Sequence, residues 1–174
     1  EVVSELYGVI REAAGDAVVI ACNAVSHLSA GIFEVYRTGD DTSGRLWSRT
    51  RAYGVNTLAF RLCQNDAFYK IDADCVGIIP GKIDWSLNRQ WLDILSVSGS
   101  PLFISVKPDD ITDSMKEDIK KAFFRNSEQK DKAEPLDWLY NNQPQCWLIN
   151  GEKREYDFVE NSYPELLSGS TQSY

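Results

Sequence analysis

Charged side chains gather where one predicted strand ends. Residues 32–37 predict a β-strand, and Arg37, Asp40 and Asp41 stand at and just beyond its end. The carboxyl ends of strands are where α/β folds concentrate their chemistry, so this segment is a candidate site. The alternative interpretation is structural, because an aspartate at the start of a helix accepts hydrogen bonds from backbone N–H groups.

Two further predicted strand ends carry polar side chains. Asn23 follows the apolar run 17–22, and Asp72 and Asp74 lie in the segment 71–77, on one face if that segment is a strand. Several carboxylates with one arginine suit a polyhydroxylated substrate, because carboxylates accept hydrogen bonds from sugar hydroxyls and a protonated carboxyl can protonate a glycosidic oxygen. A divalent-metal site would use the same residue types. Surface acidity in an acidic protein would also explain them.

Helical and strand patterns alternate along the first part of the chain, which is typical of βα units on a parallel sheet. The apolar runs at 17–22 and 102–106 indicate strands buried on both faces. Thr42 or Ser43 is expected to cap the helix that follows the candidate site. The predicted helices span residues 3–13, 46–62, 86–97 and 114–123, and the predicted strands span residues 17–22, 32–37, 71–77 and 102–106.

The pattern changes near residue 130, where the chain becomes polar and charged. Further on, Asn150 and Gly151 stand between two strand-like runs, and this dipeptide is a strong signal for a β-hairpin. We therefore expect an α/β unit over residues 1–130. A linker and the beginning of an antiparallel β-domain are expected over residues 131–174.

The composition disfavours several classes of partner and cofactor. The net charge is −8, which argues against binding to a nucleic-acid backbone. Four cysteines without CxxC spacing and a single histidine argue against a zinc site, and no other metal or cofactor is predicted. No apolar run reaches 18 residues, so no membrane span is predicted. Glu1 already lies in a helical pattern, which suggests a piece of a longer protein.

Two segments carry motifs that are found together in one enzyme clan. Residues 37–42 read RTGDDT, with an arginine four places before an aspartate, and residues 71–77 read IDADCVG. The first segment resembles the Arg-x-x-x-Asp strand end in the catalytic barrel of the melibiase clan, the retaining α-galactosidases and α-N-acetylgalactosaminidases of glycoside hydrolase families 27 and 36. The second resembles the clan's Asn-Asp-Pro-Asp-Met/Cys strand, with Ala73 in place of proline.

The resemblance continues along the chain. Residues 85–90 (WSLNRQ) and 99–105 (GSPLFIS) resemble the last helix of the clan's barrel and its small-x-Pro-Leu-hydrophobic-x-Ser strand. Residues 135–138 (PLDW) fall where the barrel passes into a C-terminal β-sandwich. The implied fold is the C-terminal portion of a (β/α)8 TIM barrel, followed by the start of an antiparallel β-sandwich.

The resemblance also implies roles for individual residues. Asp41, four places after Arg37, corresponds to the general acid/base, with Asp40 as the alternative for this role. Arg37 is expected to bond the sugar or the nucleophile, and Asn23 is expected to contact the substituent at C2 of the sugar. The implied catalytic residue is Asp41, and the implied substrate-binding residues are Asn23, Arg37, Asp40, Asp72 and Asp74.

The clan's nucleophile is an aspartate in a Lys-x-Asp setting on an earlier strand, about two strand units before Asn23. The resemblance thus implies a fragment of a retaining glycoside hydrolase that cleaves terminal α-galactoside-type linkages. This fragment supplies the general acid/base and lacks the nucleophile. Its expected partners are a carbohydrate substrate and the missing N-terminal half of the barrel, and the parent is expected to be secreted or periplasmic. The alternatives are a non-catalytic carbohydrate-binding barrel relative and a generic α/β protein.

Overall fold

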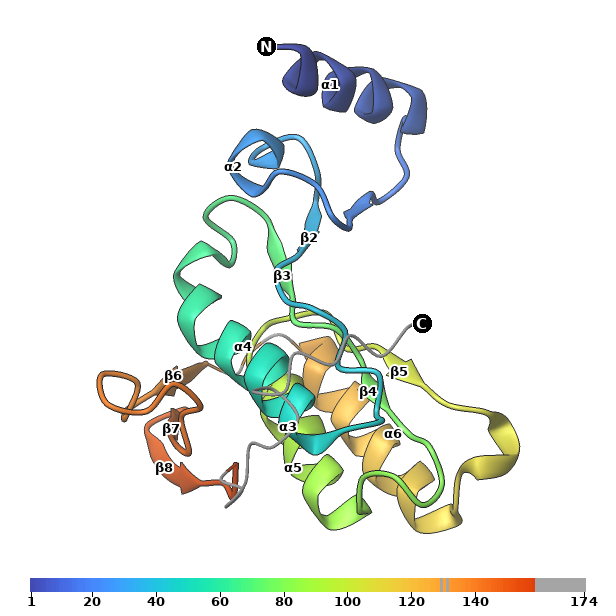
Figure 1. Cartoon of the computed structure of the whole chain (residues 1–174), viewed down its shortest axis with the longest axis vertical. Helices are drawn as coiled ribbons and strands as arrows, with labels where there is room; N and C mark the ends of the chain where they lie inside the picture. Colours follow the sequence, from blue (N-terminus) through green and yellow to red (C-terminus); the bar gives the residue numbers. More distant parts are fainter. Residues whose placement is uncertain (129, 131, 159–174) are drawn as a thin grey trace, which may run out of the picture.

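The computed structural model describes residues 1–128, 130 and 132–158. The first two helices and the first strands lie at one end of the molecule, and the longer helices α5 and α6 lie at the other (Figure 1). None of the helices in the described ranges is long and apolar enough to cross a membrane. The last residues of the predicted β-domain, 159–174, lie outside the described part.

Three short strands form a parallel sheet in the order β1-β2-β3. These strands are β1 (Ile20–Ala21), β2 (Val35–Arg37) and β3 (Lys70–Asp72). A second parallel sheet consists of β4 (Val76–Gly77) and β5 (Ile104–Ser105). The prediction of parallel strands is therefore confirmed. Over the described residues both sheets are open, and the barrel as a whole stays a prediction.

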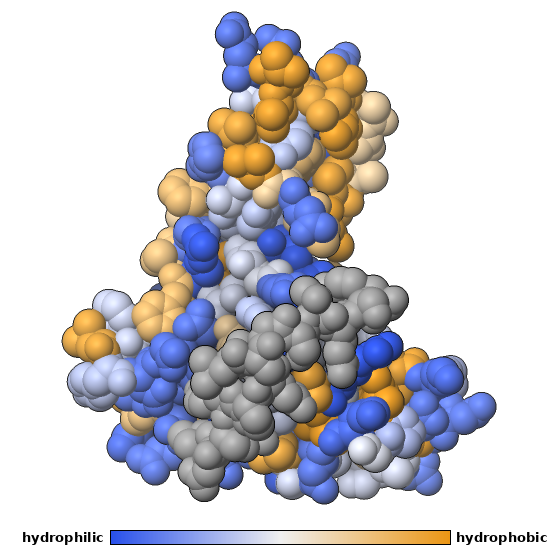
Figure 2. All heavy atoms as spheres, viewed as in Figure 1, coloured by the Kyte–Doolittle hydropathy of each residue, from blue (hydrophilic) through white to orange (hydrophobic). Residues whose placement is uncertain are grey.

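The run 17–22 does not form a strand buried on both faces, and this prediction is wrong. Only Ile20 and Ala21 are paired, and the side chains of Val18 and Ile20 are 68% and 46% exposed. The reason is that β1 is an edge strand, with a neighbour on one side only among the described residues. Helix α1 (Val2–Ala14) has no buried residue either, and apolar side chains gather on the surface at this end of the molecule (Figure 2).

The segment 71–77 was predicted as one strand, and this is also wrong. Asp74 has a φ of 73°, a left-handed conformation that ends β3 and turns the chain into β4. The two strands belong to different sheets. The turn removes the simple alternation of faces on which the prediction for Asp72 and Asp74 rested.

The predicted helix 46–62 is an irregular helical stretch made of three pieces. A short α3 (Trp47–Arg49) leads into a π-helical turn, Thr50–Val55, which continues into α4 (Asn56–Arg61). The remaining helices are α2 (Ser26–Ser29), the 3₁₀ turn Leu62–Gln64, α5 (Trp85–Val97), the 3₁₀ turn Pro108–Asp110 and α6 (Asp113–Glu128).

Helix α5 supplies the centre of the hydrophobic core. Trp91 and Leu95 are completely buried and belong to the same cluster as Leu58 of α4 and Ile71 of β3. Asp84 caps this helix by accepting a hydrogen bond from the backbone N–H of Ser86 at 2.8 Å. The apolar spacing that predicted the helix 86–97 is therefore the buried face of α5.

The predicted hairpin around Asn150 and Gly151 is confirmed. These residues have φ angles of 52° and 86°, which is the requirement of a type I′ turn. The turn joins β7 (Cys146–Ile149) to β8 (Glu152–Glu155), and β6 (Ala133–Pro135) pairs with β7 on the other side, so the sheet is an antiparallel meander. Trp147 of β7 joins the main core.

Candidate functional site

The ends of β2 and β3 are aligned by their pairing. Arg37, the last residue of β2, lies opposite Asp72, the last residue of β3. Beyond this pair the backbone N–H of Thr38 donates a hydrogen bond to the Asp72 carbonyl at 2.9 Å, so the two strands remain side by side for one more residue. Because parallel strands point the same way, the polar residues after both strands meet at one edge.

Arg37 joins two of the predicted carboxylates at this edge. Its Nη2 atom lies 2.7 Å from Asp41 Oδ1 and 2.9 Å from Asp74 Oδ2. Asp72 is linked to the same group because its Oδ1 accepts a hydrogen bond from the backbone N–H of Asp74 at 2.8 Å. We call these four residues, Arg37, Asp41, Asp72 and Asp74, the strand-end cluster. The structure thus brings together four of the six residues predicted for the site.

Thr42 holds the loop after β2 against this cluster, a role that sequence reasoning missed. Its backbone N–H donates to Asp74 Oδ2 at 2.6 Å, and its buried hydroxyl lies 3.0 Å from the same oxygen and 2.6 Å from the Cys75 carbonyl. The prediction that Thr42 or Ser43 caps the next helix is wrong, because α3 begins after Leu46 without a side-chain cap and the Thr42 side chain faces Asp74 and Cys75. Thr42 and Asp74 are separated by 32 residues, and no local pattern signals such a contact.

Two glycines allow the loop to approach so closely. The backbone of Gly44, with a φ of 74°, rests on the backbone of Gly77 in β4, and a Cβ atom on either residue would overlap with the other segment. This contact places the loop beside Asp74, which is three residues before Gly77. The pair of glycines therefore sets the distance at which Thr42 can reach the cluster.

Asp40 and Asn23 lie outside the cluster. Asp40 Oδ2 pairs with Arg49 Nη2 at 3.1 Å, and its Oδ1 accepts a hydrogen bond from the Asp41 N–H at 2.7 Å. Asp40 does not cap a helix, which was the alternative interpretation for the aspartate pair, because α3 begins after Leu46 and has no side-chain cap. Asn23 is exposed just beyond β1, with a φ of 58°, and within the described residues it makes no hydrogen bond to the cluster.

The environment keeps Arg37 charged and Cys75 neutral. Burial alone would lower the pKa of Arg37, but the carboxylates of Asp74, Asp41 and Asp72 outweigh it and raise the pKa. Burial, with the adjacent Asp74 carboxylate, raises the pKa of the Cys75 thiol to about 12. The thiol therefore keeps its proton at neutral pH, and it does not serve as a nucleophile at this site.

Asp72 is the carboxyl of the cluster that burial affects most clearly. Its side chain is 5% exposed, and desolvation raises its pKa against the opposing effects of the Asp74 N–H and of Arg37. Folding thus favours the protonated form. The stability that Asp72 contributes is fully present below its pKa in the unfolded chain, and it is lost as the pH rises through the raised pKa of the folded state.

Replacing Asp72 with Asn should therefore change how stability depends on pH. The amide oxygen still accepts the Asp74 N–H, but the titration is removed. In urea denaturation between about pH 3 and pH 7, Asp72→Asn should gain stability relative to wild type as the pH rises.

Asp84→Asn serves as a control of opposite sign. Hydrogen bonds from the Ser86 hydroxyl and N–H lower the pKa of Asp84, so its contribution is present above the unfolded pKa and is lost as the pH falls. Asp84→Asn should accordingly lose stability relative to wild type as the pH rises. If both variants moved in the same direction with pH, the assignment for Asp72 would be wrong.

No protein-family model matches the chain, and no curated protein matches it. Within the described residues, no three His, Cys, Asp or Glu side chains come together in a way that could hold a metal ion.

Proposed function

We propose that this chain is the C-terminal portion of a (β/α)8 barrel of a retaining, α-galactosidase-like glycoside hydrolase, with the first strands of a β-sandwich behind it. One observation carries the proposal: a single guanidinium nitrogen of Arg37 contacts both Asp41 and Asp74 at the paired ends of two parallel strands. Such an edge is where barrel enzymes hold their catalytic side chains.

Asp41 is the general acid/base in this proposal. Its side chain is 48% exposed, so a ligand can reach it, whereas the side chain of Asp74 is 14% exposed and held by Thr42. Asp41 Oδ1 contacts Arg37, and among the described residues Oδ2 accepts no hydrogen bond. In the reaction, Asp41 would first protonate the leaving glycosidic oxygen and then take a proton from the attacking water.

The nucleophile of the proposed reaction lies outside these 174 residues. A retaining mechanism needs a second carboxylate about 5–5.5 Å from the acid/base. Asp72 is unsuited to this role, because it is 5% exposed and burial raises its pKa, whereas an attacking carboxylate must be ionised and accessible. The second carboxylate would come from the N-terminal half of the barrel.

A binding function without hydrolysis is the second candidate. The observation that favours it is that Asp41 and Asp74 share one arginine nitrogen, because carboxylates in ion pairs act as hydrogen-bond acceptors. Such acceptors suit sugar hydroxyls but do not cleave a bond. Both candidates use the strand-end cluster to bind a sugar. They differ in whether a second carboxylate, acting as nucleophile, lies next to it.

The proposal predicts that the loss of kcat/KM in Asp41→Ala depends on the leaving group of the substrate. In the parent protein, the variant should lose about 100-fold or more in kcat/KM on an aryl α-galactoside with a poor leaving group. It should lose much less on one with a very good leaving group, since that group departs without protonation. The measurement is a kcat/KM series over leaving-group pKa, and equal losses across the series would count against the acid/base role.

Two controls accompany this measurement, and a binding experiment separates the two candidates. Asp109→Ala changes an exposed carboxylate after β5, outside the strand-end cluster, and should leave kcat/KM within about twofold of wild type. The 174-residue chain by itself should show no turnover, and turnover by it would contradict the missing nucleophile. Saturable galactose binding by the parent without any hydrolysis would favour the non-catalytic relative.

A further inference from the structure

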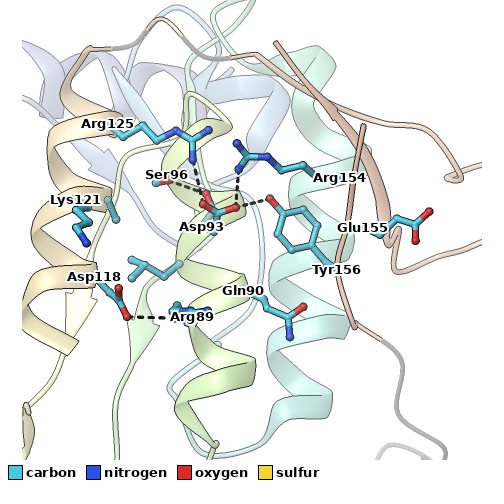
Figure 3. A pocket seen from close by; sticks show the side chains of 12 residues that line it. Arg89, Gln90, Asp93, Ser96, Asp118, Lys121, Arg125, Arg154, Glu155 and Tyr156 are labelled. Carbon is cyan, nitrogen blue, oxygen red and sulfur yellow. Dashed lines mark hydrogen bonds and ion pairs between the residues drawn. The ribbon is translucent and has the colours of Figure 1, made fainter. Parts of the chain in front are cut away.

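A cavity between α5, α6 and β8 is lined by none of the four residues of the strand-end cluster. It has a volume of about 540 Å³, within the range of small-molecule sites. Its walls come from α5, α6 and β8, so residues far apart in the sequence face one another across it (Figure 3). Buried Leu92 and Ala122 give it an apolar lining.

Asp93 of α5 holds two arginines together in this cavity. Arg125 Nη1 of α6 lies 3.0 Å from Asp93 Oδ1, and Arg154 Nη1 of β8 lies 3.1 Å from Asp93 Oδ2. The Tyr156 hydroxyl also donates to Oδ2 at 2.7 Å. One carboxylate therefore contacts two guanidinium groups and holds them on the same side of the cavity.

Basic side chains outnumber acidic ones in the lining, with Arg89, Lys121, Arg125 and Arg154 against Asp93, Asp118 and Glu155. Lys121 on α6 adds a cation that forms no ion pair with any described residue. Asp118 faces Arg89 at 4.0 Å and also accepts the Trp85 Nε1–H. Glu155 points away from the cavity in Figure 3 and pairs with Lys153 at 2.8 Å. This excess of basic side chains stands out in a chain whose net charge is −8.

We propose that this cavity binds a small organic anion, whose phosphate or carboxylate group lies between Arg154 and Lys121 and whose apolar body contacts Leu92 and Ala122. Guanidinium groups present several N–H donors in a plane that matches the oxygens of both anions. Asp93 and Tyr156 hold the Arg154 side chain in place before the ligand arrives, which lowers the entropy lost on binding. The proposal is independent of the glycosidase assignment.

Lys121 and Lys120 form a matched pair for the test. Both are exposed lysines at adjacent positions on α6, and only Lys121 lines the cavity. The probe is phenyl phosphate, titrated into the 174-residue chain and followed by ¹⁵N–¹H NMR shifts and by calorimetry. Wild type should show saturable shifts at residues of α5, α6 and β8, and benzyl alcohol, which lacks the charge, should show none.

Lys121→Gln should weaken phenyl phosphate binding about 5- to 10-fold, and Lys120→Gln by less than about 2-fold. Arg154→Gln should weaken it further, with circular dichroism checking that the hairpin stays folded. Benzoate and inorganic phosphate, as separate titrations, distinguish a carboxylate preference from a phosphate preference. Equal weakening by Lys120→Gln and Lys121→Gln would show diffuse charge attraction and overturn the proposal, as would the absence of saturation below about 10 mM.

Discussion

Arg51→Ala is expected to lower the free energy of unfolding by about 3–5 kcal/mol. Arg51 stands in the π-helical turn Thr50–Val55, and its side chain is only 1% exposed. Its Nη1 atom donates to Gln143 Oε1 at 2.9 Å and to the Phe158 carbonyl at 2.8 Å. Alanine would leave both acceptors without this donor and would open a cavity beside the core.

The size of this effect follows from the two contributions. Losing a hydrogen bond to a buried acceptor costs about 1–3 kcal/mol, and removing a long buried side chain adds the cost of the cavity. The guanidinium itself is costly to bury, which offsets part of the loss. Arg51→Met separates these effects because it keeps most of the volume and removes the donors. It should fall between Arg51→Ala and wild type.

The measurement is urea denaturation, with Arg45→Ala as the matched control. Arg45 precedes the same helical stretch but is exposed, so its removal should change stability by no more than about 0.5 kcal/mol. Hydrogen exchange should also show the amides of β7 and β8 losing protection before those of β2 and β3, because Arg51 connects the helices to the C-terminal segment. Equal stability of Arg51→Ala and Arg45→Ala would contradict this role.

Local signals in the sequence predicted several parts of the fold. The hairpin followed from Asn150 and Gly151, because both residues tolerate positive φ in a type I′ turn. Apolar spacing predicted α5, whose Trp91 and Leu95 face the core. The strand-end argument predicted that Arg37 would meet carboxylates, since paired parallel strands carry their ends to one edge.

The remaining features depend on contacts between distant parts of the chain. Thr42 reads as a helix cap in isolation, and only the approach of Asp74, 32 residues away, gives it another partner. The break at Asp74 is a left-handed residue in a run that otherwise favours a strand. Burial of Arg51 depends on Gln143, 92 residues further on. Periodicity and turn propensity contain no information about such pairs, so the sequence could not predict them.

Gly44→Ala is expected to destabilise the protein by about 3 kcal/mol or more and to disturb the strand-end cluster. Two costs combine at this position. Its φ of 74° is strained for any residue with a side chain, and the new Cβ would overlap with the Gly77 carbonyl, which is backbone and cannot rotate away. The loop would have to move off β4, and Thr42 would move with it away from Asp74.

Gly81→Ala provides the matched control for this prediction. Its φ of 71° is nearly the same, but no atom lies within 4 Å of the position of its Cβ, so it measures the backbone strain alone, about 1 kcal/mol. The difference between the stability losses of Gly44→Ala and Gly81→Ala then measures the effect of the close contact between Gly44 and Gly77. Hydrogen exchange should show the Thr42 amide losing protection in Gly44→Ala and keeping it in Gly81→Ala. Equal losses of stability in the two variants would mean that the loop tolerates a side chain against β4, and that the glycine contact does not position Thr42.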